Sequence, residues 1–72
     1  MRKNKQYESF GQLIIKCRYE RDVDNQISLL KKINEKLPRG KRIKLPTLMT
    51  DDYVSRALDI IEERIFGQAI YS

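Results

Sequence analysis

Residues 50–67 read TDDYVSRALDIIEERIFG, and this stretch decides the fold because it carries the start, the face and the end of an amphipathic helix. Thr50 is a favourable N-cap, and Asp51 and Asp52 put negative charge in the first turn, where the helix dipole favours it. Gly67 is suited to ending the helix. Between these ends, apolar residues at helical spacing form one stripe: Val54, Ala57, Leu58, Ile61 and Ile65. The sequence therefore predicts a helix over residues 51–66.

Two more helices are predicted upstream of this one. The first covers residues 6–20, where the apolar positions share one face: Tyr7, Phe10, Leu13, Ile14 and Cys17. The second covers residues 23–37, with either Asp22 or Asp24 as its N-cap and Pro38 as its stop. Its stripe has the same spacing: Val23, Ile27, Leu30, Ile33 and Leu37.

Three amphipathic helices predict an all-α fold, a small three-helix domain that occupies residues 1–72 as one unit. Residues 38–50 are the long basic loop between the second and third helices, and residues 1–5 are a flexible basic arm. A chain of 72 residues buries a small core and usually needs help from a disulfide, a metal or a second chain. Cys17 has no second cysteine to pair with, and the chain has no His for a zinc site. A second copy of the chain or another partner is left to supply that help, and we expect a dimer.

The net charge of +5 is unevenly distributed along the chain. Residues 31–44 hold seven basic residues against Glu35 alone, whereas residues 45–72 hold two basic residues against five acidic ones. Basic loop side chains attract either an acidic protein surface or phosphates, and an ordinary solvated surface is the alternative, which we expect for the lysines of the second helix. The candidate partner- or phosphate-binding residues lie in the loop: Arg39, Lys41, Arg42 and Lys44.

The residue types argue against an enzyme. No His is present to act as a general acid or base, and Cys17 lies on an apolar stripe with no activating imidazole. Asp51 and Asp52 are explained by helix capping, and Glu62 and Glu63 by a solvated helix face. We therefore expect no catalytic residues, no metal ligands and no cofactor.

No apolar stretch approaches the roughly 20 residues of a membrane span, and no apolar segment of a secretory signal follows the basic start. The lone cysteine suits a reducing compartment. We expect a cytoplasmic protein without a membrane partner.

The leading functional hypothesis is a small non-enzymatic regulatory protein that binds a protein partner, including a second copy of itself. The third-helix stripe supplies candidate dimer or partner packing residues: Val54, Leu58, Ile61 and Ile65. The alternative is a small DNA-binding transcriptional regulator, in which the loop and the N-terminal arm contact phosphates.

The order of several short segments resembles the YmgB/AriR-type biofilm-development regulators of enteric bacteria. The segments are Phe10-Gly11-Gln12, then Asn25-Gln26 before Leu29, Leu30 and Ile33, then Asp52 before Ala57-Leu58-Asp59-Ile60-Ile61. The resemblance covers about residues 10–62. It implies a small, dimeric, cytoplasmic three-helix regulator that connects stress signals to a two-component phosphorelay or binds DNA. This chain departs from the family pattern in its more basic and differently spaced loop, and in Arg21, where the family prefers Gly.

Overall fold

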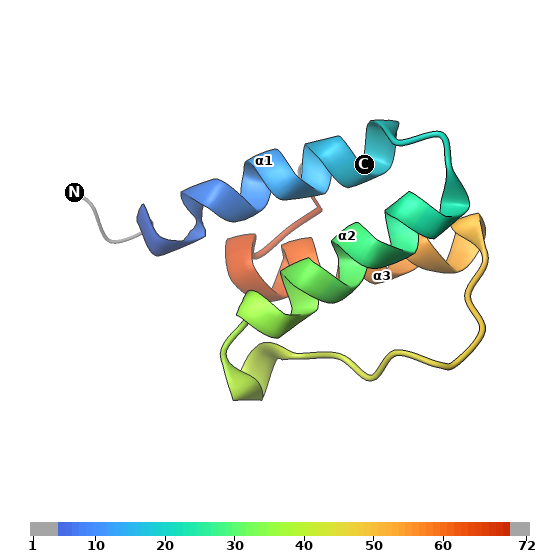
Figure 1. The fold of residues 1–72 in the computed structure, drawn as a ribbon. Helices are drawn as coiled ribbons and strands as arrows, with labels where there is room; N and C mark the ends of the chain where they lie inside the picture. Colours follow the sequence, from blue (N-terminus) through green and yellow to red (C-terminus); the bar gives the residue numbers. More distant parts are fainter. Residues whose placement is uncertain (1–4, 70–72) are drawn as a thin grey trace.

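The computed structural model describes residues 5–69, with side chains from residue 10 onward. Three α-helices make up the fold in this range: α1 (Lys5–Tyr19), α2 (Val23–Lys36) and α3 (Asp51–Phe66) (Figure 1). No strand occurs among the described residues. The all-α prediction is confirmed there, and α3 has the predicted bounds. The predicted arm over residues 1–5 lies almost wholly outside the described residues.

The helix ends follow from their capping residues. Asp22 accepts a hydrogen bond from the Asp24 amide at 2.9 Å, and Thr50 accepts one from the Tyr53 amide at 3.2 Å, so each satisfies a free N–H of a first turn. Leu37 precedes a proline and is extended, with ψ 148°, which ends α2. Gly67 takes the left-handed conformation, with φ 85°, and its amide closes α3 on the carbonyl of Glu63.

The long connection between α2 and α3 follows from the direction of the helices. α1 runs antiparallel to α2, whereas α2 and α3 begin at the same end of the molecule (Figure 1). A helix of 14 residues is roughly 21 Å long, so the chain must travel back along that length before α3 begins. Residues 38–50 make this return. They are not wholly irregular, because Arg39–Lys41 forms the short 3₁₀-helix η1.

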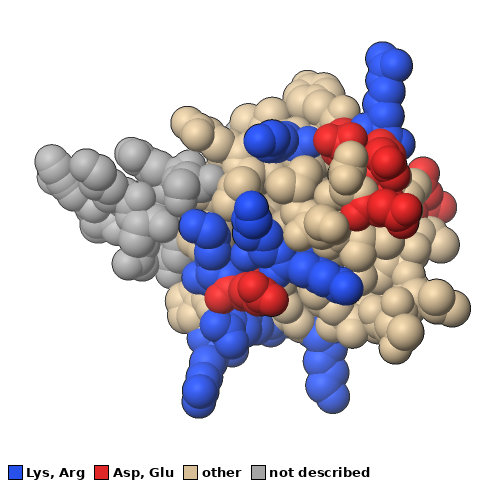
Figure 2. All heavy atoms as spheres, viewed as in Figure 1, with Lys and Arg blue, Asp and Glu red and all other residues tan. Residues whose placement is uncertain are grey.

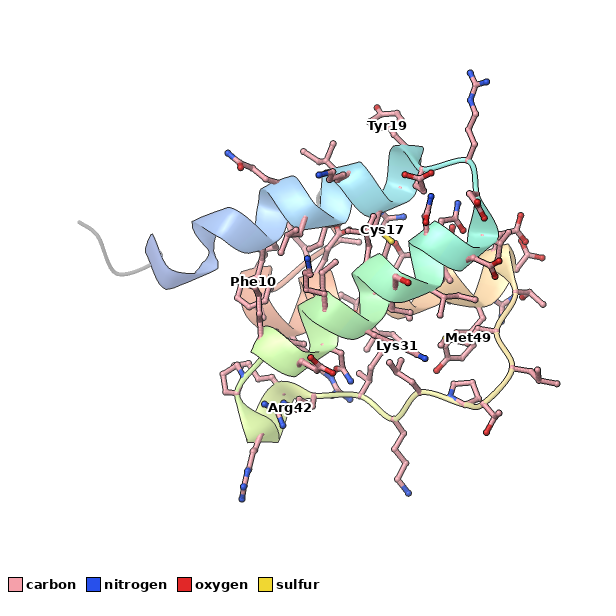
Figure 3. All side chains as sticks on the ribbon, viewed as in Figure 1. Phe10, Cys17, Tyr19, Lys31, Arg42 and Met49 are labelled. Atoms are coloured by element: carbon pink, nitrogen blue, oxygen red, sulfur yellow. The ribbon has the colours of Figure 1, made fainter. Side chains whose placement is uncertain are left out.

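The core lies where the three helix faces meet. Its buried apolar side chains all belong to the predicted stripes, although Val23 of the second stripe is exposed, and Figure 3 shows Phe10 and Cys17 of α1 directed toward the other helices. From α1 and α2 the core takes Phe10, Ile14, Cys17, Leu30, Ile33 and Leu37. From α3 it takes Val54, Ala57, Leu58, Ile61 and Ile65. Tyr7 belongs to the predicted first stripe, but its side chain lies outside the described set.

Candidate functional site

The loop is held against the helices by hydrogen bonds from side chains to its backbone. The Asn34 amide group donates to the carbonyl of Ile43 at 2.9 Å and accepts from its N–H at 3.0 Å. The Tyr53 hydroxyl donates to the Lys44 carbonyl at 3.0 Å. These contacts pin residues 43 and 44 between α2 and the first turn of α3.

The four predicted loop cations divide into two pairs. Arg42 folds back under the end of α2 and donates to the carbonyls of Leu37 at 2.8 Å and Glu35 at 2.9 Å (Figure 3). Lys41 donates to the carbonyl of Arg64 at 3.1 Å, near the end of α3. Both cations therefore satisfy free carbonyls at helix C-termini, where the dipole favours positive charge.

Arg39 and Lys44, the other pair, are exposed, and their side chains make no hydrogen bond or ion pair within the described residues. The same holds for three lysine side chains of α2, which are exposed and make no hydrogen bond or ion pair among the described residues: Lys31, Lys32 and Lys36. Figure 2 shows Lys and Arg side chains gathered over the C-terminal half of α2 and the start of the loop. We call this surface the basic face: Lys31, Lys32, Lys36, Arg39 and Lys44.

The basic face differs from the sequence prediction in its membership. Sequence reasoning assigned the three lysines of α2 to an ordinary solvated surface and placed the site in the loop alone. The structure brings Arg39 next to these lysines, because η1 follows directly on the end of α2, and Lys44 lies three residues beyond η1 in the loop. Glu35 is also exposed on this part of α2, so the face has one negative charge among its positive ones.

The acidic side chains collect at the other end of the molecule. α2 and α3 both begin there, and each has acidic residues in its first turn (Figure 2). The group includes Glu20, Asp22, Asp24, Asp51 and Asp52. The uneven charge along the sequence is thus a charge separation in space.

An ion-pair cluster joins α1 to α3. The Arg18 guanidinium donates to Glu62 at 2.6 and 3.1 Å and to Asp59 at 2.6 Å. Burial alone would lower the pKa of Arg18, but the hydrogen bonds to Glu62 and Asp59 outweigh it and raise that pKa above its ordinary value. The prediction that Glu62 lies on a solvated face was wrong, since its side chain is fully buried. Glu62 lies four residues after Leu58, and this helical spacing could have placed it on the core side of α3.

The apolar stripe of α3 is buried in the core of this chain. Val54, Leu58, Ile61 and Ile65 are between 0% and 9% exposed and pack against α1 and α2. In this conformation these four side chains have no surface left for a dimer or partner contact. The exposed large apolar side chains lie elsewhere: Ile15, Tyr19, Val23, Leu48 and Ile60.

Cys17 is fully buried, and its thiol donates to the Gln26 carbonyl at 3.3 Å. Burial raises the pKa of the Cys17 thiol from 9.0 to about 11, against the opposing charge of Arg18. This environment suits a small core residue and disfavours a thiolate nucleophile.

We predict that native Cys17 reacts about 100-fold more slowly with iodoacetamide at pH 8 than it does in the urea-unfolded chain, because raising the pKa from 9.0 to about 11 lowers the thiolate fraction by roughly that factor. The unfolded chain ionises this thiol first, so the free energy of unfolding should also fall as the pH rises from about 9 to 11. Equal alkylation rates in the folded and unfolded chains would show that Cys17 is not a buried core thiol.

Within residues 5–69, no helix has the length and hydropathy to cross a membrane. No group of three or more candidate side chains in that range is placed to hold a metal ion. What the described residues do present is a charged surface. Comparison with known proteins gives no further guide to its use, since no protein-family model, no curated protein and no solved structure matches this chain.

Proposed function

We propose that the protein is a non-enzymatic cytoplasmic regulator that acts by binding another protein, and that the basic face is its contact surface. The observation that carries this proposal is the set of five cations that have no partner among the described residues. They lie together on α2, η1 and the start of the loop, away from the acidic end. Such a surface attracts and orients an acidic partner.

The remaining chemistry of the chain supports a binding role. Cys17 is buried as a thiol, and the buried carboxylate of Glu62 is paired with Arg18. Both groups therefore contribute to the packing and charge pairing of the folded core. Membership of the YmgB/AriR-type regulators, which the sequence resembles, is part of the same proposal.

DNA binding is the second candidate, and the same five cations favour it because they are free to neutralise phosphates. Glu35 counts against it, since a carboxylate among the lysines repels a phosphate backbone, whereas a protein surface can offer it a cation. A helix-turn-helix protein also needs a recognition helix directly after a short turn, and the connection before α3 is too long for that.

Site-specific photocrosslinking in the native host tests the protein-binding proposal. A photoreactive amino acid at position 36, within the basic face, is expected to give discrete protein adducts. The same residue at position 56, on the exposed side of α3, is the matched control and should not give them. Identical adducts from both positions, or none from position 36, would overturn the proposal.

Fluorescence anisotropy with a DNA duplex of about 20 base pairs tests the second candidate. If five cations neutralise phosphates, affinity should fall roughly 500-fold between about 50 and 200 mM salt. Replacement of Lys31, Lys32 and Lys36 by Ala should then abolish binding while far-ultraviolet circular dichroism stays unchanged. No binding at the lower salt concentration would eliminate the DNA-binding candidate.

A further inference from the structure

The segment that leaves η1 is extended, and its side chains alternate between covered and exposed. Ile43 and Leu45 are half-buried and pack against the core, whereas Arg42 and Lys44 are exposed. Alternation with a period of two is the pattern of a strand that has one covered face. We call residues 41–45 the strap. Its covered face presents two apolar side chains, two residues apart, to the rest of the molecule.

The backbone of the strap is held from both sides by side chains of the flanking helices. On the α2 side, the Asn34 amide group accepts from the N–H of Ile43 at 3.0 Å and donates to its carbonyl at 2.9 Å. On the α3 side, Arg64 donates to the carbonyl before Ile43 at 2.8 Å, and the Tyr53 hydroxyl donates to the carbonyl after it at 3.0 Å. Successive residues thus bond to opposite edges, as in an extended strand.

This arrangement is the one by which proteins hold an extended peptide. Hydrogen bonds to the main chain bind an extended segment of any sequence, and the covered face selects side chains at alternate positions. Ile43 and Leu45 are the side chains selected here. We call the place that holds them the strap site: Asn34 of α2, Tyr53 and Arg64 of α3, and the apolar surface between them.

The charge of the strap is poorly suited to this place. Lys44, between the two apolar anchors, belongs to the basic face and has no ion-pair partner among the described residues. Figure 3 shows Lys31 of α2 directed toward the loop. An acidic residue in place of Lys44 would be attracted to the lysines of α2, whereas the cation is repelled by them.

We propose that the strap site binds an extended segment of a partner protein, and that the strap occupies it as an internal competitor. The partner segment carries apolar side chains two residues apart, with an acidic residue between them. The site lies beside the basic face and does not depend on that face being a contact surface. Failure of the crosslink at position 36 would therefore leave this proposal standing.

The loop is long enough for the strap to leave its site while the helices stay in place. Fully extended, residues 38–50 span roughly 45 Å, about twice the length of α2 that they retrace. While it remains tethered, the strap competes as an intramolecular ligand, at an effective concentration in roughly the millimolar range. A partner segment enters when it fits better than the strap does.

Titration of the full chain with a peptide, followed by nuclear magnetic resonance, tests the proposal. The peptide has the sequence of residues 39–47 of this chain. It should bind the variant Ile43→Ala/Leu45→Ala at least about tenfold more tightly than the unmodified chain, because the weakened strap competes less. Adding Asn34→Ala to that variant should lower the affinity at least about tenfold, because two hydrogen bonds to the peptide backbone are lost.

Two altered peptides separate the fit of the segment from its charge. The peptide with Ile43→Ser/Leu45→Ser keeps the charge and should not bind, which excludes simple attraction to the acidic end. The peptide with Lys44→Glu should bind at least about threefold more tightly at about 50 mM salt and lose that gain at about 0.5 M. Equal affinities of the Lys44→Glu and unaltered peptides at low salt would overturn the acidic character of the partner.

Far-ultraviolet circular dichroism shows whether the strap variant folds, and Ile43→Ala alone replaces the double variant if the latter is unfolded. A folded strap variant that binds no peptide would overturn the proposal. So would one that binds the peptide equally well after Asn34→Ala.

Discussion

Replacing Arg18 by Met is expected to lower the free energy of unfolding by about 3–5 kcal/mol, because it removes the cation that pairs with the buried carboxylate of Glu62. The Glu62 side chain is fully buried, and the Arg18 side chain is only 15% exposed. A domain of this size has a total stability of roughly the same magnitude. The variant should therefore be largely unfolded at neutral pH and room temperature, as measured by far-ultraviolet circular dichroism and urea titration.

Two control variants test whether this effect comes from the loss of the buried ion pair. Asp59→Asn removes the more exposed partner of Arg18, whose side chain is 42% exposed, and should cost less than about 1 kcal/mol. The double variant Arg18→Met/Glu62→Met removes both buried charges and should recover most of the lost stability. If the double variant were as unstable as Arg18→Met, packing by the arginine stem would be the main contribution instead.

Replacing Ile61 by Ala is expected to lower the free energy of unfolding by about 2–5 kcal/mol, because it opens a cavity at a fully buried position in the core. The next residue along α3 gives the matched control. Ile60 has the same side chain but is 44% exposed, and Ile60→Ala should change stability by less than about 1 kcal/mol. Urea titrations of both variants measure the difference, and equal losses would mean that the face of α3 turned toward the core is misassigned.

The secondary structure could be predicted closely because its signals are local. The bounds of α3 follow from Thr50 and Gly67, and the end of α2 follows from Pro38. Helical spacing also gave the core, since its buried members lie on the predicted stripes.

The surface was predicted less well because it depends on which helices become neighbours. Lys41 and Arg42 were expected to face a partner, but they bind carbonyls at the ends of α3 and α2, which only the return of the loop brings within reach. The pairing of Arg18 with Glu62 joins residues 44 positions apart. Sequence reasoning assigned Glu62 to a solvated face, although its spacing of four residues from Leu58 placed it on the core side of the helix, and no local signal identified the cation opposite.

The parallel course of α2 and α3 has a consequence for the order of folding. The contacts between α1 and α2 close across a short turn, whereas α3 reaches its place only after the intervening segment has closed a long loop, which costs more chain entropy. We therefore expect a helical hairpin of α1 and α2 to form first and α3 to dock last. On the ribosome, this order leaves the apolar sides of Ile14, Leu30 and Ile33 uncovered until the end of the chain has emerged.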